Sequence, residues 1–172
     1  MRKLMFLLLC LLLSGCQTAA AGQGYFKAQD LPKIINNAAN SVEQGFDVSK
    51  YLSEVTREGN RAAVDFLPPA FPHKGLSFSL EDVGRDDSSN TLAFTMRLEQ
   101  NGNQPQGELV LACLLMVVHA TSPTRQDELA YEIEDILKDG KVVVINGWQY
   151  SAVADEDSDP MVLVFRARKL ED

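Results

Sequence analysis

The stretch that decides the fold is LSFSLEDVGRDDSSNTLAFTMRL, residues 76–98. Apolar residues hold every second position on both sides of a polar turn at residues 85–90: Leu76, Phe78, Leu80, then Leu92, Phe94, Met96 and Leu98. Side chains alternate between the two faces of a strand, so this pattern predicts two half-buried strands. The stretch therefore indicates an antiparallel sheet with one face on a core.

The next segment, residues 109–118, is apolar at every position. Periodicity alone does not separate a central strand from a buried helix in such a run. We favour a strand, because two alternating strands lead into it. Ser122-Pro123 then predicts the start of a helix, which ends at Gly140. Its apolar stripe is formed by Leu129, Ile133, Ile136 and Leu137.

Two further strands are predicted near residues 142–153 and 161–168, and Asn146-Gly147 is compatible with a hairpin turn or with a bulge. Upstream, Asp30 is a candidate N-cap for a helix that stops at Gly45. Residues 46–57 fit a helix or a strand, and Glu58-Gly59-Asn60 predicts a turn. The sum is an α+β domain over residues 30–172, with an antiparallel sheet of five to seven strands and two main helices on one face.

The N-terminus has the anatomy of a secretory signal. Arg2 and Lys3 precede ten unbroken apolar residues, Leu4 to Leu13, and that run is shorter than the ~20 residues of a membrane span. The sequence Leu13-Ser14-Gly15-Cys16 follows. Ala19-Ala20-Ala21 offers an ordinary signal-peptide cleavage site as the alternative.

The tetrapeptide ending at Cys16 resembles the lipobox of bacterial lipoproteins. That resemblance implies cleavage after residue 15, acylation of Cys16, and a flexible tether over residues 16–29. Gln17 stands where an Asp resembles an inner-membrane retention signal, so the outer membrane is expected, facing the periplasm, with surface exposure as the alternative. Two or more acyl chains anchor a protein firmly, whereas one chain is marginal.

Charge and cysteine content limit the classes of partner. The net charge is −8, and removal of the leader with Arg2 and Lys3 lowers it to −10. A surface of this sign repels nucleic acid and anionic lipid headgroups. Cys10 leaves with the leader and Cys16 is acylated, so Cys113 has no partner for an internal disulfide and is predicted to be a packed hydrophobe.

No constellation of residues indicates catalysis or a metal. His119 precedes Thr121 and Ser122, but the chain has no Gly-x-Ser-x-Gly motif, and a strand-end histidine bonded to the backbone is the simpler interpretation. His73 is predicted to lie in a proline-rich loop. The acidic run at 154–160 departs from a calcium loop, because Pro160 stands in place of the required glycine. We expect neither a catalytic site nor a metal or other cofactor.

The candidate contact residues for a partner are Trp148, Tyr150, Asp155, Asp157 and Asp159. Aromatic residues anchor many interfaces, although a single Trp on a sheet also fits a core. A basic cluster at Arg166, Arg168 and Lys169 is expected to pair with neighbouring acidic residues.

The expected function is that of a non-enzymatic accessory or assembly subunit, held at the outer membrane by its lipid and bound to another envelope protein. Two alternatives stay open: an immunity or inhibitor protein against a cationic toxin or hydrolase, and a carrier of an apolar ligand such as a lipid. The sequence leaves the oligomeric state open.

Overall fold

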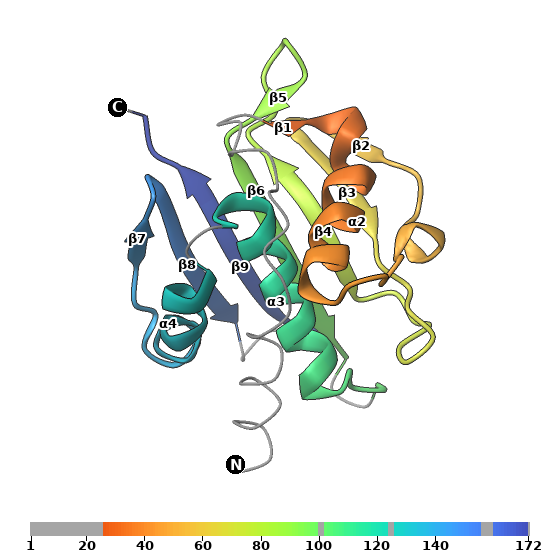
Figure 1. The fold of residues 1–172 in the computed structure, drawn as a ribbon. Coiled ribbons are helices and arrows are strands. Elements are labelled where there is room, and N and C mark those ends of the chain that lie inside the picture. The colour runs from red at the N-terminus through yellow and green to blue at the C-terminus, as the bar shows by residue number, and fades with distance from the viewer. Residues whose placement is uncertain (1–25, 100–101, 124–125, 156–159, 172) are drawn as a thin grey trace.

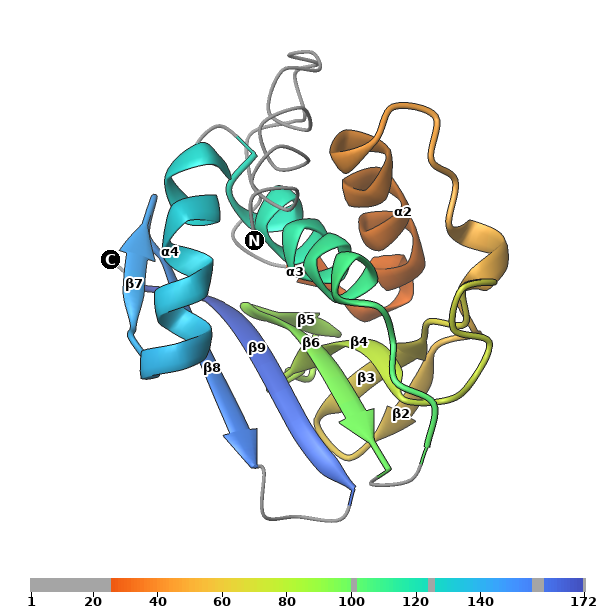
Figure 2. The same ribbon diagram turned by 90° about the horizontal axis from the view of Figure 1, so that it is seen from below.

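The computed structural model describes residues 26–99, 102–123, 126–155 and 160–171. Its main element is a seven-stranded antiparallel sheet with three helices packed on one face (Figures 1 and 2). The predicted α+β class is confirmed. In spatial order the strands are β2 (Thr56–Glu58), β3 (Arg61–Asp65), β4 (Leu76–Glu81), β6 (Thr91–Leu98), β9 (Met161–Lys169), β8 (Trp148–Asp155) and β7 (Val143–Ile145).

The predicted pair of alternating strands forms the centre of the sheet. Phe78 of β4 lies opposite Phe94 of β6, and Phe94 lies opposite Phe165 of β9. All three rings have no solvent exposure, and the centroids of Phe78 and Phe94 are 5.4 Å apart. Apolar alternation therefore placed one face of these strands against the helices, as strand geometry requires.

The run predicted as a central strand is a helix, α3 (Gly107–Thr121). The prediction was wrong because α3 has apolar neighbours around most of its circumference: α2, α4, β6 and β9 all contact it. A helix enclosed in this way needs apolar residues on every side and loses the 3.6-residue pattern. The fold thus has three helices on the sheet instead of the two main ones expected.

The other two helices agree with their sequence patterns. In α2 (Leu31–Val42) the residues at helical spacing are buried, and in α4 (Gln126–Asp139) Leu129, Ile133 and Ile136 are buried. Gly140 follows α4 with a φ of +62°, the left-handed conformation typical of a helix end. Helix α4 begins at Gln126, three residues after Pro123.

Asn146-Gly147 is a hairpin turn, which resolves the alternative of a bulge. Its two residues have φ values of +53° and +71°, and the flanking residues Ile145 and Trp148 pair directly. Positive φ at both central positions is the signature of the tight turn that joins twisted strands.

The folded part of the chain begins earlier than the expected boundary at residue 30. Strand β1 (Phe26–Lys27) pairs with β5 (Ser88–Ser89), inside the segment predicted as a polar turn. The Phe26 ring packs against Trp148 at 5.6 Å, and Ala28 has no solvent exposure. Residues 26–29 therefore belong to the domain and not to a tether. Residues 46–57, for which the sequence fits a helix or a strand, contain one turn of 3-10 helix at Ser49–Tyr51 and then the start of β2.

Candidate functional site

One face of the sheet carries no helix within the described residues, and Figure 2 shows it on the side away from α2, α3 and α4. We call it the uncovered face. It is formed by the residues that alternate with the core positions, and most of them are polar or small. They are Thr56, Glu58, Arg61, Ala63, Asp65, Ser77, Ser79, Glu81, Thr91, Ala93, Thr95, Arg97, Val144, Gln149, Ser151, Val153, Asp155, Val162, Val164, Arg166 and Arg168.

Small residues form the floor of this face, and long side chains lie over them. Ser79 and Ala93 have no solvent exposure although no helix covers them. Arg61 reaches Ser79, where its Nη2 donates to the Ser79 hydroxyl at 3.1 Å. The floor is therefore buried by side chains of the same face, which makes the face a polar layer and not a second core.

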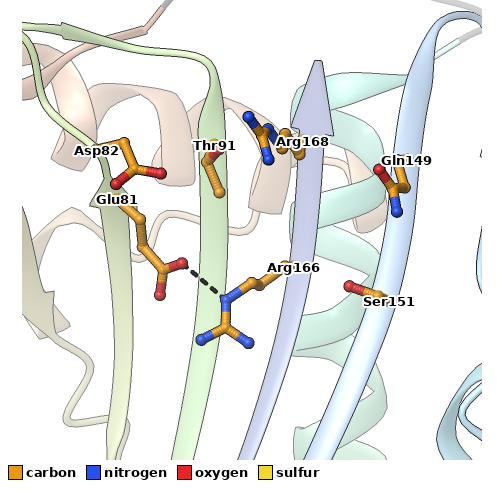
Figure 3. A pocket seen from close by; sticks show the side chains of 7 residues that line it. All are labelled: Glu81, Asp82, Thr91, Gln149, Ser151, Arg166 and Arg168. Atoms are coloured by element: carbon orange, nitrogen blue, oxygen red, sulfur yellow. Dashed lines mark hydrogen bonds and ion pairs between the residues drawn. The ribbon is translucent and has the colours of Figure 1, made fainter. Parts of the chain in front are cut away.

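An ion pair crosses the centre of the uncovered face. The Arg166 Nε on β9 donates to the Glu81 Oε2 on β4 at 2.7 Å, although β6 lies between these two strands (Figure 3). Two strand spacings amount to about 9–10 Å. The two long side chains bridge that distance diagonally: Glu81 lies opposite Thr91 of β6, and Arg166 lies opposite Ala93, whose small side chain leaves room for the arginine.

A hollow on this face lies beside the ion pair and has a volume of about 270 Å³. Figure 3 shows its side chains, which come from β4, β6, β8 and β9 and from Asp82 just past the end of β4. Within the described part of the chain Arg168 has no hydrogen-bond or ion-pair partner, and its side chain is exposed. The hollow thus offers a free guanidinium beside the neutral polar groups of Thr91, Gln149 and Ser151.

The second hollow, of about 210 Å³, lies toward β2 on the same face. Arg61 and Arg97 line it together with the carboxylates of Glu58 and Asp65. The Arg61 Nε is buried and has no hydrogen-bond partner among the described residues. An unsatisfied buried donor of this kind costs free energy, which a ligand or partner accepting the bond would recover.

All basic residues on the uncovered face are arginines: Arg61, Arg97, Arg166 and Arg168. The described strands place no lysine there, although the chain contains as many lysines as arginines. Protein interfaces are enriched in Arg and depleted in Lys, because the planar guanidinium forms several bonds at fixed geometry and loses less freedom. The basic residues of this face therefore have the composition typical of contact surfaces.

Trp148 and Tyr150 do share a strand face, but it is the face toward the helices. Trp148 is 3% exposed and Tyr150 is fully buried. The Tyr150 hydroxyl donates to Ser122 Oγ at 2.7 Å and lies 2.8 Å from Thr121 Oγ1. Burial raises the pKa of Tyr150. The two contacts of its hydroxyl group hold the side chain in the core. The two rings therefore take no part in the surface proposed below.

Of the acidic residues predicted as contacts, Asp155 is exposed at the end of β8 on the uncovered face. Asp157 and Asp159 lie outside the described residues, as do Cys16 and the leader. The expected pairing of the basic cluster is seen for Arg166, which binds Glu81. Lys169 instead donates to the Asn146 carbonyl oxygen at 3.1 Å.

The serine, threonine and histidine residues considered for catalysis have the following contacts in the fold. Ser122 and Thr121 bind the Tyr150 hydroxyl, and His119 lies in the last turn of α3 instead of at a strand end. The His73 Nε2 lies 2.9 Å from the Asn103 amide nitrogen. Burial raises the pKa of the Cys113 thiol, which keeps it protonated and unreactive. In the described ranges no group of three His, Cys, Asp or Glu side chains is placed to hold a metal ion.

No protein-family model matches this chain, and neither a curated protein nor a solved structure matches it. Among the described helices none is long and apolar enough to cross a membrane.

The interpretation of the sequence missed the uncovered face as a unit. A signal for it was present, since Arg61, Arg97, Arg166 and Arg168 all hold the polar positions of alternating segments. Only the strand order brings Arg61 and Arg168 onto one surface, because these two residues are 107 positions apart in the chain.

Proposed function

We propose that this protein is a lipid-anchored accessory subunit of the bacterial cell envelope and that it binds a partner protein on the uncovered face of its sheet, without catalysis. The observation that carries the proposal is the arginine-only basic character of that face, with Arg168 unpartnered among the described residues. Guanidinium groups bind carboxylates through paired hydrogen bonds of fixed geometry. The partner surface is accordingly expected to present carboxylates and amides to this face.

The expected anchor supports the same role. Cys16 lies ten residues before Phe26, where the described fold begins, and an extended chain spans at most ~3.3–3.6 Å per residue. The domain is then held within about 35 Å of the lipid. Confinement to a membrane raises the effective concentration of two proteins, so even a weak interface is occupied. Outer-membrane placement, facing the periplasm, rests on the residue after the acylated cysteine, Gln17.

Replacement of the acylated cysteine tests the anchor. Cys16→Ser is expected to move nearly all of the protein from the membrane fraction to the soluble periplasmic fraction, because no acyl chain is then attached. Cell fractionation followed by immunoblotting measures this. The matched control is Ser14→Ala, which keeps the cysteine and is expected to leave the protein in the membrane. Membrane retention of the Cys16→Ser protein would contradict the anchor.

A cysteine placed on the uncovered face tests the docking surface. Ser151→Cys introduces a reactive thiol beside Arg168, whereas the buried Cys113 thiol stays silent and serves as the blank. A photoreactive maleimide on this thiol in the acylated protein is expected to crosslink to one envelope protein. The adduct should fall at least tenfold when Arg168→Glu is added, since an exposed, unpartnered side chain can be changed without disturbing the fold.

The control places the same label on the opposite side of the molecule. Lys33 is exposed on α2, so Lys33→Cys should give no such adduct. Equal adducts from both positions, or an Ser151→Cys adduct unaffected by Arg168→Glu, would contradict docking on the uncovered face. Capture of a soluble basic hydrolase would instead support an inhibitor, and recovery of a bound lipid would support an apolar-ligand carrier.

A further inference from the structure

Strand β8 has a free edge beyond the end of β7. It is eight residues long, and β7 pairs only with Trp148, Gln149 and Tyr150. The next residues, Ser151–Ala154, pair with β9 on one side, and no described strand pairs with them on the other. Figure 1 shows the arrow of β8 running past β7.

The hydrogen-bond pattern fixes which backbone groups point out from this edge. The Leu170 N–H donates to the Gly147 carbonyl at 2.8 Å, so odd-numbered residues of β8 direct their backbone groups toward β9. Even-numbered residues direct theirs the other way. Trp148 and Tyr150 use them to pair with β7, whereas the N–H and C=O groups of Ala152 and Ala154 have no strand partner among the described residues.

This edge lacks the devices that protect strand edges. Such devices are short length, proline, bulges and charged side chains. Strand β2, at the far edge of the sheet, is three residues long and all of them are exposed polar or charged residues. Ala152, Val153 and Ala154 carry no charge, and Val153 is 58% exposed. An unprotected edge of this kind is a template for another strand.

We infer that the partner of this protein adds an extended segment to the free edge of β8, through the backbone groups of Ala152 and Ala154. The inference rests on the proposed function and specifies its mode of binding. Main-chain bonds supply affinity in strand addition, and alternate side chains supply specificity. Val153 lies opposite Val164, so an apolar partner residue packs beside them on the uncovered face.

Charge selects a basic segment. The chain carries a net charge of −8, and the carboxylate of Asp155 lies two residues from Val153 on the same face. A cationic residue of the added strand, two positions from its apolar residue, comes beside Asp155. On the face that carries Val153 and Asp155, the partner segment is therefore expected to present an apolar residue followed, two positions along, by a basic residue.

A second copy of this chain fits the edge less well. Symmetric antiparallel pairing about Val153 would match Ala152 with Ala154 of the other copy. The two domains brought together in this way would each carry a net charge of −8 and repel each other.

The test uses a ten-residue peptide in which every second residue is in turn valine and lysine, with threonine at the positions between them, added to the acylated protein in neutral detergent. Binding is expected to slow hydrogen exchange at the Ala152 and Ala154 amides at least tenfold. Ala154→Pro removes one outward N–H without removing a bond to β9, and proline is tolerated at such edge positions. It is expected to weaken peptide binding at least tenfold, whereas the control Ala154→Ser, which keeps the N–H, is not.

A second peptide distinguishes strand addition from charge attraction alone. It has the same charge but is N-methylated at alternate positions, so that its backbone cannot donate hydrogen bonds to the edge of β8. Equal binding of both peptides, no binding of either, or protection at amides other than Ala152 and Ala154 would overturn strand addition. If the Ser151→Cys adduct described above persists undiminished in Ala154→Pro, the edge inference fails while docking on the uncovered face stands. If the Ser151→Cys protein without the proline substitution forms no adduct, the proposed function itself fails.

Discussion

Phe94→Ala is expected to lower the free energy of unfolding by about 3–5 kcal/mol, the usual cost of removing a buried ring. Phe94 lies on β6, the central strand, with no solvent exposure. Its ring contacts Phe78, which in turn lies 5.9 Å from the ring of Phe66. Strand β6 is held by β4 on one side and β9 on the other, so the site cannot collapse to fill the cavity.

Denaturant unfolding followed by fluorescence measures this loss. Trp148 is the sole tryptophan and is buried against Phe26, so its emission reports on the folded state. Leu170→Ala is the matched control: Leu170 is 37% exposed at the end of the chain, and the change is expected to cost less than about 0.5 kcal/mol. Similar losses for both variants would contradict a core centred on β6.

The backbone at Gly75 gives the second large effect. Gly75 precedes β4 with a φ of +144°, a conformation that side chains disfavour. A Cβ there would lie 2.7 Å from the carbonyl oxygen of Arg97, whose own N–H donates to the Gly75 carbonyl. Gly75→Ala is therefore expected to lower the free energy of unfolding by about 2–3 kcal/mol, measured in the same denaturation experiment.

Gly107→Ala is the control for this prediction. Gly107 begins α3, has no atom within 4 Å of the position of an added Cβ, and does not have a positive φ. Alanine is the better helix former by about 1 kcal/mol, so this variant is expected to be unchanged or slightly more stable. Loss of stability in Gly107→Ala but not in Gly75→Ala would be the opposite of what the close approach to Arg97 requires.

The parts of the fold that could be predicted from the sequence are those in which the local pattern of apolar residues reflects the surroundings. The strands at 76–81 and 91–98 and the helix with Leu129 and Ile133 have one apolar side each, and their period reveals both type and orientation. Helix α3 has no such asymmetry, because other elements surround it. Its conformation depends on contacts that no local window contains.

The candidate site shows a similar division. The local sequence predicts which strand positions are polar, and these positions form the uncovered face. It also shows the resemblance of residues 13–16 to a lipobox. The aromatic side chains of Trp148 and Tyr150 predict a contact surface, yet the helices cover their face of β8 and leave the other face uncovered. Burial is a property of the assembled layers, so alternation predicts that two residues share a face but not which face is enclosed.

Residue order along the chain thus determined the two central strands, helix α4 and the sign of the charge, because these depend on near neighbours or on composition alone. Tertiary structure decided that Arg61, Glu81, Arg166 and Arg168 share one surface and that β8 outruns β7. Strand order and strand overhang arise from pairings between segments far apart in the chain, where packing of the whole core selects one arrangement.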